Sequence, residues 1–395
     1  MRIKININRL PLIDFILSII YIFFANYFSN ISHSGLIDTI LKSLKYISLG
    51  MFALALINAI LCDFNKGTFI LTYVSVSLII IGITYFFHGE VAQYFGDTVI
   101  SYLGISMRMA LLLYIIDEYE LLLKAITWYS VFVSAFLFLQ FFVVGISYNN
   151  GRYSMGLGYI SLLPALILIF AFFEKRKIVF LISVVILIGI MLIYASRGPI
   201  LCVLLCAALL VLRKSKPFVI ISALCLALLC FIFISDILQF ISGLVPNGVQ
   251  SRTLQYFLSG QATNDSGRSK LYTKIINEIL AHPFSIRGIN SDFLLIGVYT
   301  HNIFLELLYE FGILIGGFLS LSIIYKTIKT YINMNGLLEN DVCFIFMICS
   351  IPQLLMSHTL WTEWTFWAWL ILYYKLYSPF TRRVRNEIKE NGAEF

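Results

Sequence analysis

The residues best suited to chemistry lie in one polar stretch, residues 236–300, of an otherwise apolar chain. This stretch ends at the pair His301-Asn302. Histidine is the side chain whose ordinary pKa, about 6.5, suits proton transfer near neutral pH. Arginine stays charged at any working pH and grips phosphate oxygens with two N–H groups at once. The residue types therefore predict a site that binds a phosphate-bearing group and moves a proton. The cations of the polar stretch are Arg252, Arg268, Lys270, Lys274 and Arg287.

Two predicted helix starts add to this positive charge. Ser196-Arg197-Gly198-Pro199 opens one apolar run and His301-Asn302 opens another. Proline suits the first turn of a helix, and either Thr300 or Asn302 can cap the second helix. The first turn of a helix presents unpaired N–H groups and partial positive charge, which favour a bound phosphate. Taken alone, each arginine fits a contact with lipid phosphates and His301 fits a cap. The combination is what favours chemistry.

The elements that must position these residues are membrane helices. Hydrophobic residues make up 60% of the chain and charged residues only 12%, whereas a soluble domain carries about 25% charged residues. The apolar runs are continuous, whereas the strands of a membrane barrel would alternate. The sequence therefore predicts an all-α integral membrane protein with about 12 transmembrane helices of roughly 20 residues. One long external loop separates the ninth predicted span from the tenth.

The predicted organisation has four parts. Nine spans fill residues 1–235, the external loop covers 236–300, three spans fill 301–378, and a polar cytoplasmic tail covers 379–395. Lysines and arginines of the short loops concentrate on segments that share one side of the membrane, and this bias marks the cytoplasmic side. The bias places both termini in the cytoplasm and the loop on the outer face. It also accounts for the net charge of +7 without nucleic-acid binding.

Within the loop, residues 269–281 predict a helix that lies on the bilayer surface with its apolar face towards lipid. Arg268 stands at the start of this helix, at the height of the lipid headgroups, and Pro283 ends it. A separate arginine, Arg108, falls inside a predicted span. It is either a functional residue or a side chain that snorkels to the inner surface or pairs with a carbonyl group. The apolar face consists of Leu271, Tyr272, Ile275, Ile276, Ile279 and Leu280.

The remaining residues of chemical interest predict no further site. Three acidic residues of the loop are too widely spaced to bind a metal ion, so no metal site is expected. They are Asp265, Asp292 and Glu278. Four other histidines lack the setting of His301: His33, His88, His282 and His358. Tryptophans near the last span suit an interfacial belt better than a sugar platform: Trp361, Trp364, Trp367 and Trp369. The pair Gly312 and Gly316 allows close helix packing.

The ordered set of motifs carries a resemblance. The motifs are Ser196-Arg197-Gly198, Gly267-Arg268, His282-Pro283 with Gly288, His301-Asn302-x-x-Leu305 and Glu310-x-Gly312-x-x-x-Gly316. In order, spacing and position after a long external loop they resemble the O-antigen polymerase and ligase family, which includes Wzy-type polysaccharide polymerases. The close match covers roughly residues 180–320, and the first 150 residues match only as hydrophobic spans. Ile286 stands where the family often has a second glycine.

The resemblance implies a fold of the C-type glycosyltransferase class and an enzyme that uses sugars on a polyprenyl diphosphate. It implies no metal and no other cofactor, because arginines neutralise the diphosphate. By motif match, Arg197 and Arg268 bind the diphosphate, and His301 acts near the acceptor hydroxyl as a base or an orienter. The further candidates for substrate binding are Arg252, Arg287, Tyr299 and Asn302.

The resemblance favours a polymerase of O-antigen or a related surface polysaccharide in the bacterial inner membrane, with its active site facing the periplasm. The expected partners are a polyprenyl-diphosphate-linked oligosaccharide, membrane lipids and, as a further candidate, a chain-length regulator. A ligase that passes the finished glycan to lipid A-core shares the motifs and stays open. A flippase for the same lipid-linked sugar is the alternative of another class. The long external loop argues against it, because a transporter needs polar groups at mid-membrane.

Overall fold

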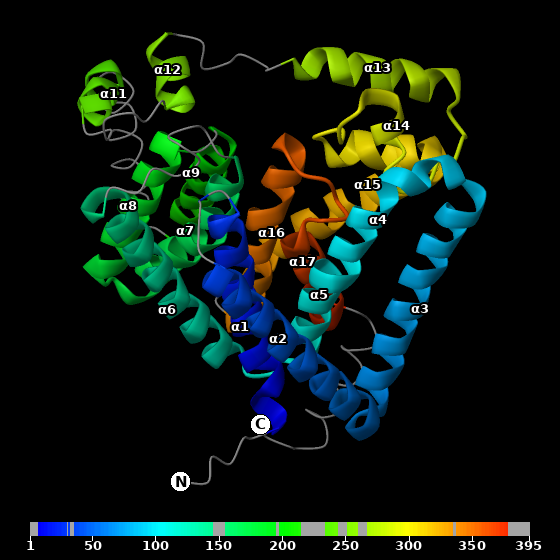
Figure 1. Cartoon of the computed structure of the whole chain (residues 1–395), viewed down its shortest axis with the longest axis horizontal. Helices are drawn as coiled ribbons and strands as arrows, with labels where there is room; N and C mark the ends of the chain where they lie inside the picture. Colours follow the sequence, from blue (N-terminus) through cyan, green and yellow to red (C-terminus); the bar gives the residue numbers. More distant parts are fainter. Residues whose placement is uncertain are drawn as a thin grey trace. The chain divides into compact units, whose positions relative to one another are not determined.

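The computed structural model describes residues 7–29, 31, 35–144, 155–194, 197–214, 234–243, 251–259, 267–334 and 337–377. Several parts of the sequence-based predictions lie outside these residues. They are His33, most of the ninth predicted span, Ser196, the loop segments 244–250 and 260–266 with Asp265, and the C-terminal tail. Within the described residues every regular element is helical (Figure 1).

Long apolar helices confirm the prediction of an all-α integral membrane protein. Eight helices among the described residues are long and apolar enough to cross a bilayer. They run over Ile7–Phe28, Gly35–Cys62, Phe64–Phe87, Gly96–Ile115, Tyr119–Val143, Gly156–Lys175, Ile303–Ile332 and Leu338–Met356. Other predicted spans also hold helices: α8 (Ile178–Tyr194), α9 (Arg197–Lys214) and α17 (Trp364–Tyr377).

The chain forms two compact units. The first comprises residues 1–18, 46–120 and 266–395, and the second comprises residues 19–45 and 121–265. The unit boundaries fall inside α1 (Leu10–Phe28) and α2 (Gly35–Cys62). The second unit also contains α6 (Tyr119–Phe138, the first two residues of which belong to the first unit), α7 (Met155–Lys175), α8, α9, α11 (Ile234–Gly243) and α12 (Arg252–Leu258). In it, α7 packs on α8 and α9, and α12 packs on α8.

The first unit holds the C-terminal part of the predicted loop, from residue 266 onwards, and the helices α15, α16 and α17. Its helices besides parts of α1 and α2 are α3 (Phe64–Phe87), α4 (Ala92–Ser101), α5 (Met107–Ile115), α13 (Arg268–Ala281), α14 (Asp292–Ile296), α15 (Ile303–Ile332), α16 (Leu338–Met356) and α17. A π-helical turn, Tyr102–Ser106, joins α4 to α5. Here α17 packs on α5 and α16, and α13 packs on α14 and α15 (Figure 1).

A buried ion pair gives Arg108 a structural role that neither sequence-based interpretation named. Its Nη2 atom lies 2.5 Å from Oδ1 of Asp14 in α1 and donates to Oγ of Ser18 at 2.7 Å. Ser48 of α2 completes the cluster, donating to the same Asp14 oxygen at 2.5 Å. Arg108 and Asp14 are both buried. Arg108 therefore neither snorkels nor pairs with a carbonyl group; it holds α5 against α1 and α2.

Helix α15 is interrupted at Gly312, and this break shapes the site. Gly312 has a φ of +70°, in the left-handed region that glycine tolerates best. The amide of Ile313 donates to the carbonyl oxygen of Pro283 at 2.7 Å instead of continuing the helix. A Cβ atom on Gly316 would lie 2.2 Å from the carbonyl oxygen of Leu307. The close approach expected of the two glycines thus occurs between the two halves of α15.

Two of the four tryptophans near α17 do not lie in an interfacial belt. Trp369 and Trp361 are buried in the first unit. The indole N–H of Trp369 donates to Thr330 Oγ1 at 3.2 Å, and that of Trp361 donates to Glu310 Oε2 at 3.0 Å. The expectation of an interfacial belt is wrong for Trp361 and Trp369, because the hydrogen-bond acceptors of both indoles lie on α15. Periodicity along α17 cannot show which neighbouring helix covers a residue.

Candidate active site

His301 sits in a strained turn just before α15. Its φ is +59°, a left-handed conformation that costs a residue with a side chain of order 1 kcal/mol. The hydroxyl of Tyr272 on α13 donates to its carbonyl oxygen at 3.3 Å. The ring of Tyr299 stands edge-on to the imidazole with a centroid separation of 4.2 Å. Contacts on both sides of His301 therefore fix this conformation.

The residues flanking His301 anchor the turn. Asn302 is the N-cap of α15: its Oδ1 accepts the amides of Phe304 at 3.0 Å and Leu305 at 3.3 Å. Of the two capping candidates, the structure thus uses Asn302. Thr300 instead donates its amide and its hydroxyl to Oδ2 of Asp292, at 2.7 and 2.8 Å. Burial raises the pKa of Asp292 above its ordinary value, and the bonds from Thr300 oppose that shift.

The surroundings of His301 keep its imidazole neutral. Burial is the main cause that lowers the pKa of His301 to about 4, and the nearby Arg268 and His358 contribute to the same shift. Its Nδ1 atom is buried and has no hydrogen-bond partner among the described residues. A neutral imidazole at physiological pH can accept a proton or a hydrogen bond from a substrate hydroxyl. The site therefore supplies a base or an orienting group beside a fixed positive charge.

Arg268 begins α13 and lies close to His301. The N-cap residue of α13 is Gly267, which has a φ of +84° and offers no side-chain hydrogen bond to the first turn of the helix. The predicted helix is present, but its apolar face does not lie wholly towards lipid. Ile275 and Ile279 pack against Tyr309 of α15. Only part of the face is exposed, including Ile276 and Leu280. Packing on α15 thus sets the position of Arg268.

Arg287 is bound by protein groups at the other end of α13. Its guanidinium donates to the carbonyl oxygens of Tyr309 and Glu278, both at 3.2 Å, and lies 4.5 Å from the centre of the Tyr309 ring. It also pairs with the carboxylate of Glu278 at 3.4 Å. These contacts tie the C-terminal end of α13 to α15. Arg287 is placed where it supports the scaffold of the site.

The turn that contains Arg287 fills the break in α15. The carbonyl oxygen of Glu310 accepts the amides of Arg287 at 2.8 Å and Gly288 at 3.1 Å. The Glu310 carboxylate accepts the amide of Asn290 at 2.5 Å. Gly288 has a φ of +83°, and a Cβ there would lie 2.9 Å from a methyl carbon of Thr84. Ile286 has no positive φ, so the turn forms without a glycine at that position.

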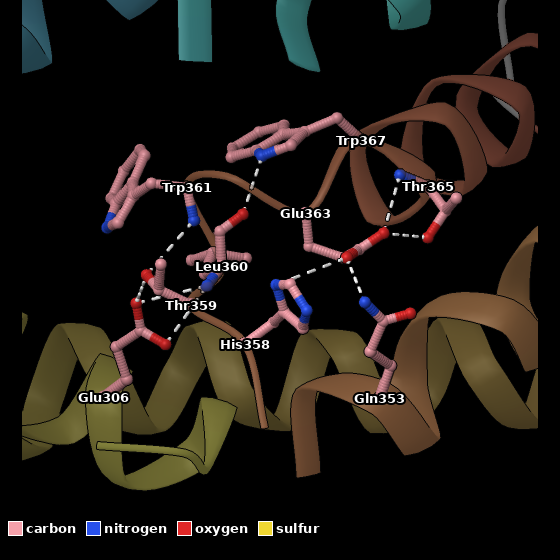
Figure 2. Close-up of polar contacts among 9 residues, drawn as sticks. All are labelled: Glu306, Gln353, His358, Thr359, Leu360, Trp361, Glu363, Thr365 and Trp367. Carbon is pink, nitrogen blue, oxygen red and sulfur yellow. Dashed lines mark hydrogen bonds and ion pairs between the residues drawn. The ribbon is translucent and has the colours of Figure 1, made fainter. Parts of the chain in front are cut away.

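A second buried carboxylate ties α15 to the connection between α16 and α17. Figure 2 shows Glu306 accepting the hydroxyl of Thr359 and the amide of Leu360, the latter at 3.2 Å. Trp367 closes the same connection by donating its indole N–H to the Leu360 carbonyl at 2.9 Å. Glu306 therefore holds the connection against the first turn of α15, five residues after His301 in the sequence. Asp292, Glu306 and Glu310 form no metal-binding group among the described residues.

The sequence interpretation missed His358. It lies on the connection between α16 and α17, close enough that a positive charge on its ring lowers the pKa of His301. Its Nδ1 atom lies 3.9 Å from Oε2 of Glu363 (Figure 2). The expectation that His358 lacks the setting of His301 is therefore wrong. The spacing of 57 residues between the two histidines carries no local signal, since only the packing of the connection onto α15 brings them together.

The predicted site residues divide between the two units. Arg268, Tyr299, His301 and Asn302 come together in the first unit. Arg197 belongs to the second unit, at the start of α9, with its guanidinium 5.0 Å from the centre of the Tyr256 ring. Arg252 begins α12 in the same unit. Nearby, Ser251 donates its hydroxyl to the carbonyl oxygen of Leu192 in α8 at 2.8 Å.

Comparison with known proteins agrees with the ordered motifs. Residues 182–320 match the model of a family described as O-antigen ligase. The match runs from α8 through the break in α15 and so includes Arg197, Arg268 and His301. No curated protein and no solved structure matches the chain significantly. Residues 182–320 of this membrane protein are thus similar to a family described as O-antigen ligase, and this similarity agrees with the resemblance carried by the ordered motifs.

Proposed function

We propose that this protein is a polymerase of O-antigen or a related surface polysaccharide. It transfers a growing glycan from polyprenyl diphosphate onto a lipid-linked repeat unit at the outer face of the bacterial inner membrane. The observation that carries the proposal is the placement of a permanently charged Arg268 beside a neutral, partly buried His301 at the start of α15. This arrangement pairs an anion-binding group with a group that can take a proton.

The proposed reaction needs only these two kinds of group. The acceptor hydroxyl oxygen attacks the anomeric carbon of the donor sugar, and the bond from that carbon to the diphosphate oxygen breaks. The electron pair stays on the diphosphate, where arginines stabilise the developing charge. The hydroxyl proton leaves to a base in the protein and then to water. We assign Arg268 and Arg197 to the diphosphate and His301 to the acceptor hydroxyl, with no metal required.

Purified protein in detergent tests this proposal. The donor and acceptor are lipid-linked repeat units extracted from a producing strain that lacks this protein. The reaction contains a chelator and no ATP or nucleotide sugar. We expect wild type to make longer lipid-linked chains, resolved as a ladder on a gel. Polymer formation that stops with chelator would contradict the metal-independent mechanism. Transfer only to added lipid A-core would instead identify a ligase, and lipid movement across vesicles without polymer would identify a flippase.

Three variants of α13 test the role of Arg268. Losing one charge-assisted contact made in the transition state costs about 3 kcal/mol, or roughly a hundredfold in rate. Arg268→Ala should show this loss, and Arg268→Lys should recover little because the forked donor is gone. Lys270→Ala is the matched control: it removes an exposed cation from the same turn of α13 and should retain the wild-type rate. Equal rates for Arg268→Ala and Lys270→Ala would contradict the assignment.

A further inference from the structure

The connection between α16 and α17 carries a histidine and a carboxylate arranged for proton transfer. The Glu363 side chain is 6% exposed, whereas the His358 side chain is 34% exposed. Oε2 of Glu363 faces Nδ1 of His358 at 3.9 Å, an ion-pair separation for a protonated imidazole (Figure 2). The two nitrogens of an imidazole lie on different sides of the ring. Nε2 of His358 is therefore turned away from the carboxylate.

The carboxylate of Glu363 is fixed before any substrate arrives. Gln353 of α16 donates its side-chain amide to Oε2 at 2.5 Å. Thr365 of α17 donates its amide to Oε1 at 3.2 Å and its hydroxyl to the same oxygen. Figure 2 shows these donors on one side of the carboxylate and His358 on the other. A base that is oriented by a third, well-held group is the arrangement that proton-transfer sites use.

His301 lacks such support. Its Nδ1 atom is buried without a hydrogen-bond partner among the described residues, so no carboxylate stands behind it. A proton on His301 would also face the positive charge of Arg268. A proton on His358 would instead face Glu363. Among the described residues, His358 has a carboxylate placed to pair with a protonated ring, and His301 is suited to orient the hydroxyl.

We propose that His358, oriented by Glu363, takes the proton from the acceptor hydroxyl in this site. The step balances simply: as the hydroxyl oxygen bonds to the anomeric carbon, its proton moves to Nε2 of His358 and later passes to water. The resulting imidazolium faces the Glu363 carboxyl group. Burial raises the pKa of Glu363 to about 7, so this group is mostly ionised only above that pH. This inference rests on the proposed glycosyl transfer and sharpens it, because it makes His301 the group that positions the hydroxyl.

Charged and titratable groups from several elements lie around His358. Glu363 faces it from its own connection, and His301 faces it from the start of α15. Glu306 of α15 binds the adjacent Thr359, and Arg268 of α13 acts on His301. Burial lowers the pKa of His358 to about 4, so the imidazole is neutral at physiological pH.

The chain contains a matched control for this pair. His282 and Glu278 also stand 3.9 Å apart, but the His282 side chain is 65% exposed. Both pairs have the same residue types and the same separation. They differ in whether the carboxylate is buried and in whether the imidazole lies near His301. Any effect of His358 that His282 does not share therefore comes from its place in the site.

The test measures the polymerisation rate of purified variants on the same extracted lipid-linked repeat units. His358→Asn should lose about 10²–10⁴-fold in rate, the contribution of a positioned base. His282→Asn should keep the wild-type rate. Glu363→Gln should lose much of the rate. Each variant is first shown to elute in detergent as wild type does, so that a misfolded protein is not scored.

Chemical rescue separates a base from a structural residue. Added imidazole should restore activity to His358→Ala, with a pH dependence that follows the titration of imidazole, and should not restore His301→Ala. Full activity of His358→Asn would overturn the proposal, and so would a folded His358→Ala that imidazole does not rescue at any pH. If wild type itself makes no polymer, the proposed function fails, and this outcome is distinct from the failure of His358 alone.

Discussion

The amide of Ile313 donates to the carbonyl oxygen of Pro283 at 2.7 Å, across the break in α15. A helix interrupted in the membrane leaves backbone groups that lipid cannot satisfy. Here the turn from Pro283 to Gly288 supplies the partners, since Glu310 in turn accepts two amides from it. The turn that carries Arg287 is therefore bound to the backbone of α15 at its break, and this part of the loop is fixed to a membrane helix there.

Gly316 should tolerate no side chain. A Cβ there would lie 2.2 Å from the Leu307 carbonyl oxygen, a rigid backbone atom. We expect Gly316→Ala to lower the free energy of unfolding by about 1–3 kcal/mol, the usual cost of overpacking. Gly317→Ala is the control, because no atom lies within 4 Å of its added Cβ. Thermal unfolding in detergent checks the pair, and equal melting temperatures would contradict the close approach.

The Asp14–Arg108 pair should behave as a structural clamp. Removing one partner of a buried ion pair leaves an uncompensated charge and costs about 3–5 kcal/mol. We expect Arg108→Met and Asp14→Leu each to reduce folded protein sharply in detergent. The double variant should recover much of the loss, since apolar replacement of both partners is often neutral. A double variant that is worse than either single one would argue for a functional role of Arg108.

The outer location of α13 can be tested by labelling. In a variant without native cysteines, Asn277→Cys places a thiol on an exposed position of α13, and Lys175→Cys places one at the end of α7. The Lys/Arg bias predicts that an impermeant thiol reagent labels Asn277→Cys in intact spheroplasts and leaves Lys175→Cys unlabelled. The reverse pattern would place α13 in the cytoplasm and remove the basis for a periplasmic site.

His301 should make stability fall in mild acid. Its pKa in the folded protein is about 4, below its ordinary value of 6.5, with burial as the main cause. The unfolded chain therefore binds the proton first, so stability is fully present above about pH 6.5 and is lost as the pH falls towards 4. His301→Gln should lose less stability than wild type between pH 7 and pH 4.5 in thermal unfolding.

The control for this titration is His282→Gln, which replaces an exposed histidine of the same unit. It should show the wild-type loss of stability over the same pH range. The slope of His301→Gln should be reduced and not abolished, because burial lowers the pKa of His358 in the same direction. An unchanged slope in His301→Gln would show that His301 does not titrate with a depressed pKa.

The sequence by itself determined the membrane class, the helices and the family motifs. Continuous apolar runs, the polar stretch before His301 and the Asn302 cap are local signals, because hydropathy and capping act over a few turns of chain. The start of α13 at Arg268 was likewise predicted to within one residue. Motif order also predicted the similarity to the family whose model matches residues 182–320, although each short motif carries little information alone.

Only the tertiary structure decided which groups face one another. Two histidine–glutamate pairs have the same 3.9 Å separation, yet His282–Glu278 lies at an exposed helix end and His358–Glu363 lies beside His301. Arg108 pairs with Asp14, which is 94 residues away in the sequence, and Arg287 donates a hydrogen bond to the carbonyl oxygen of Tyr309. Such contacts depend on how helices pack, since burial is set by neighbours from distant parts of the chain and not by residue type. The same amino acids therefore form a surface pair in one place and a candidate proton-transfer pair in another.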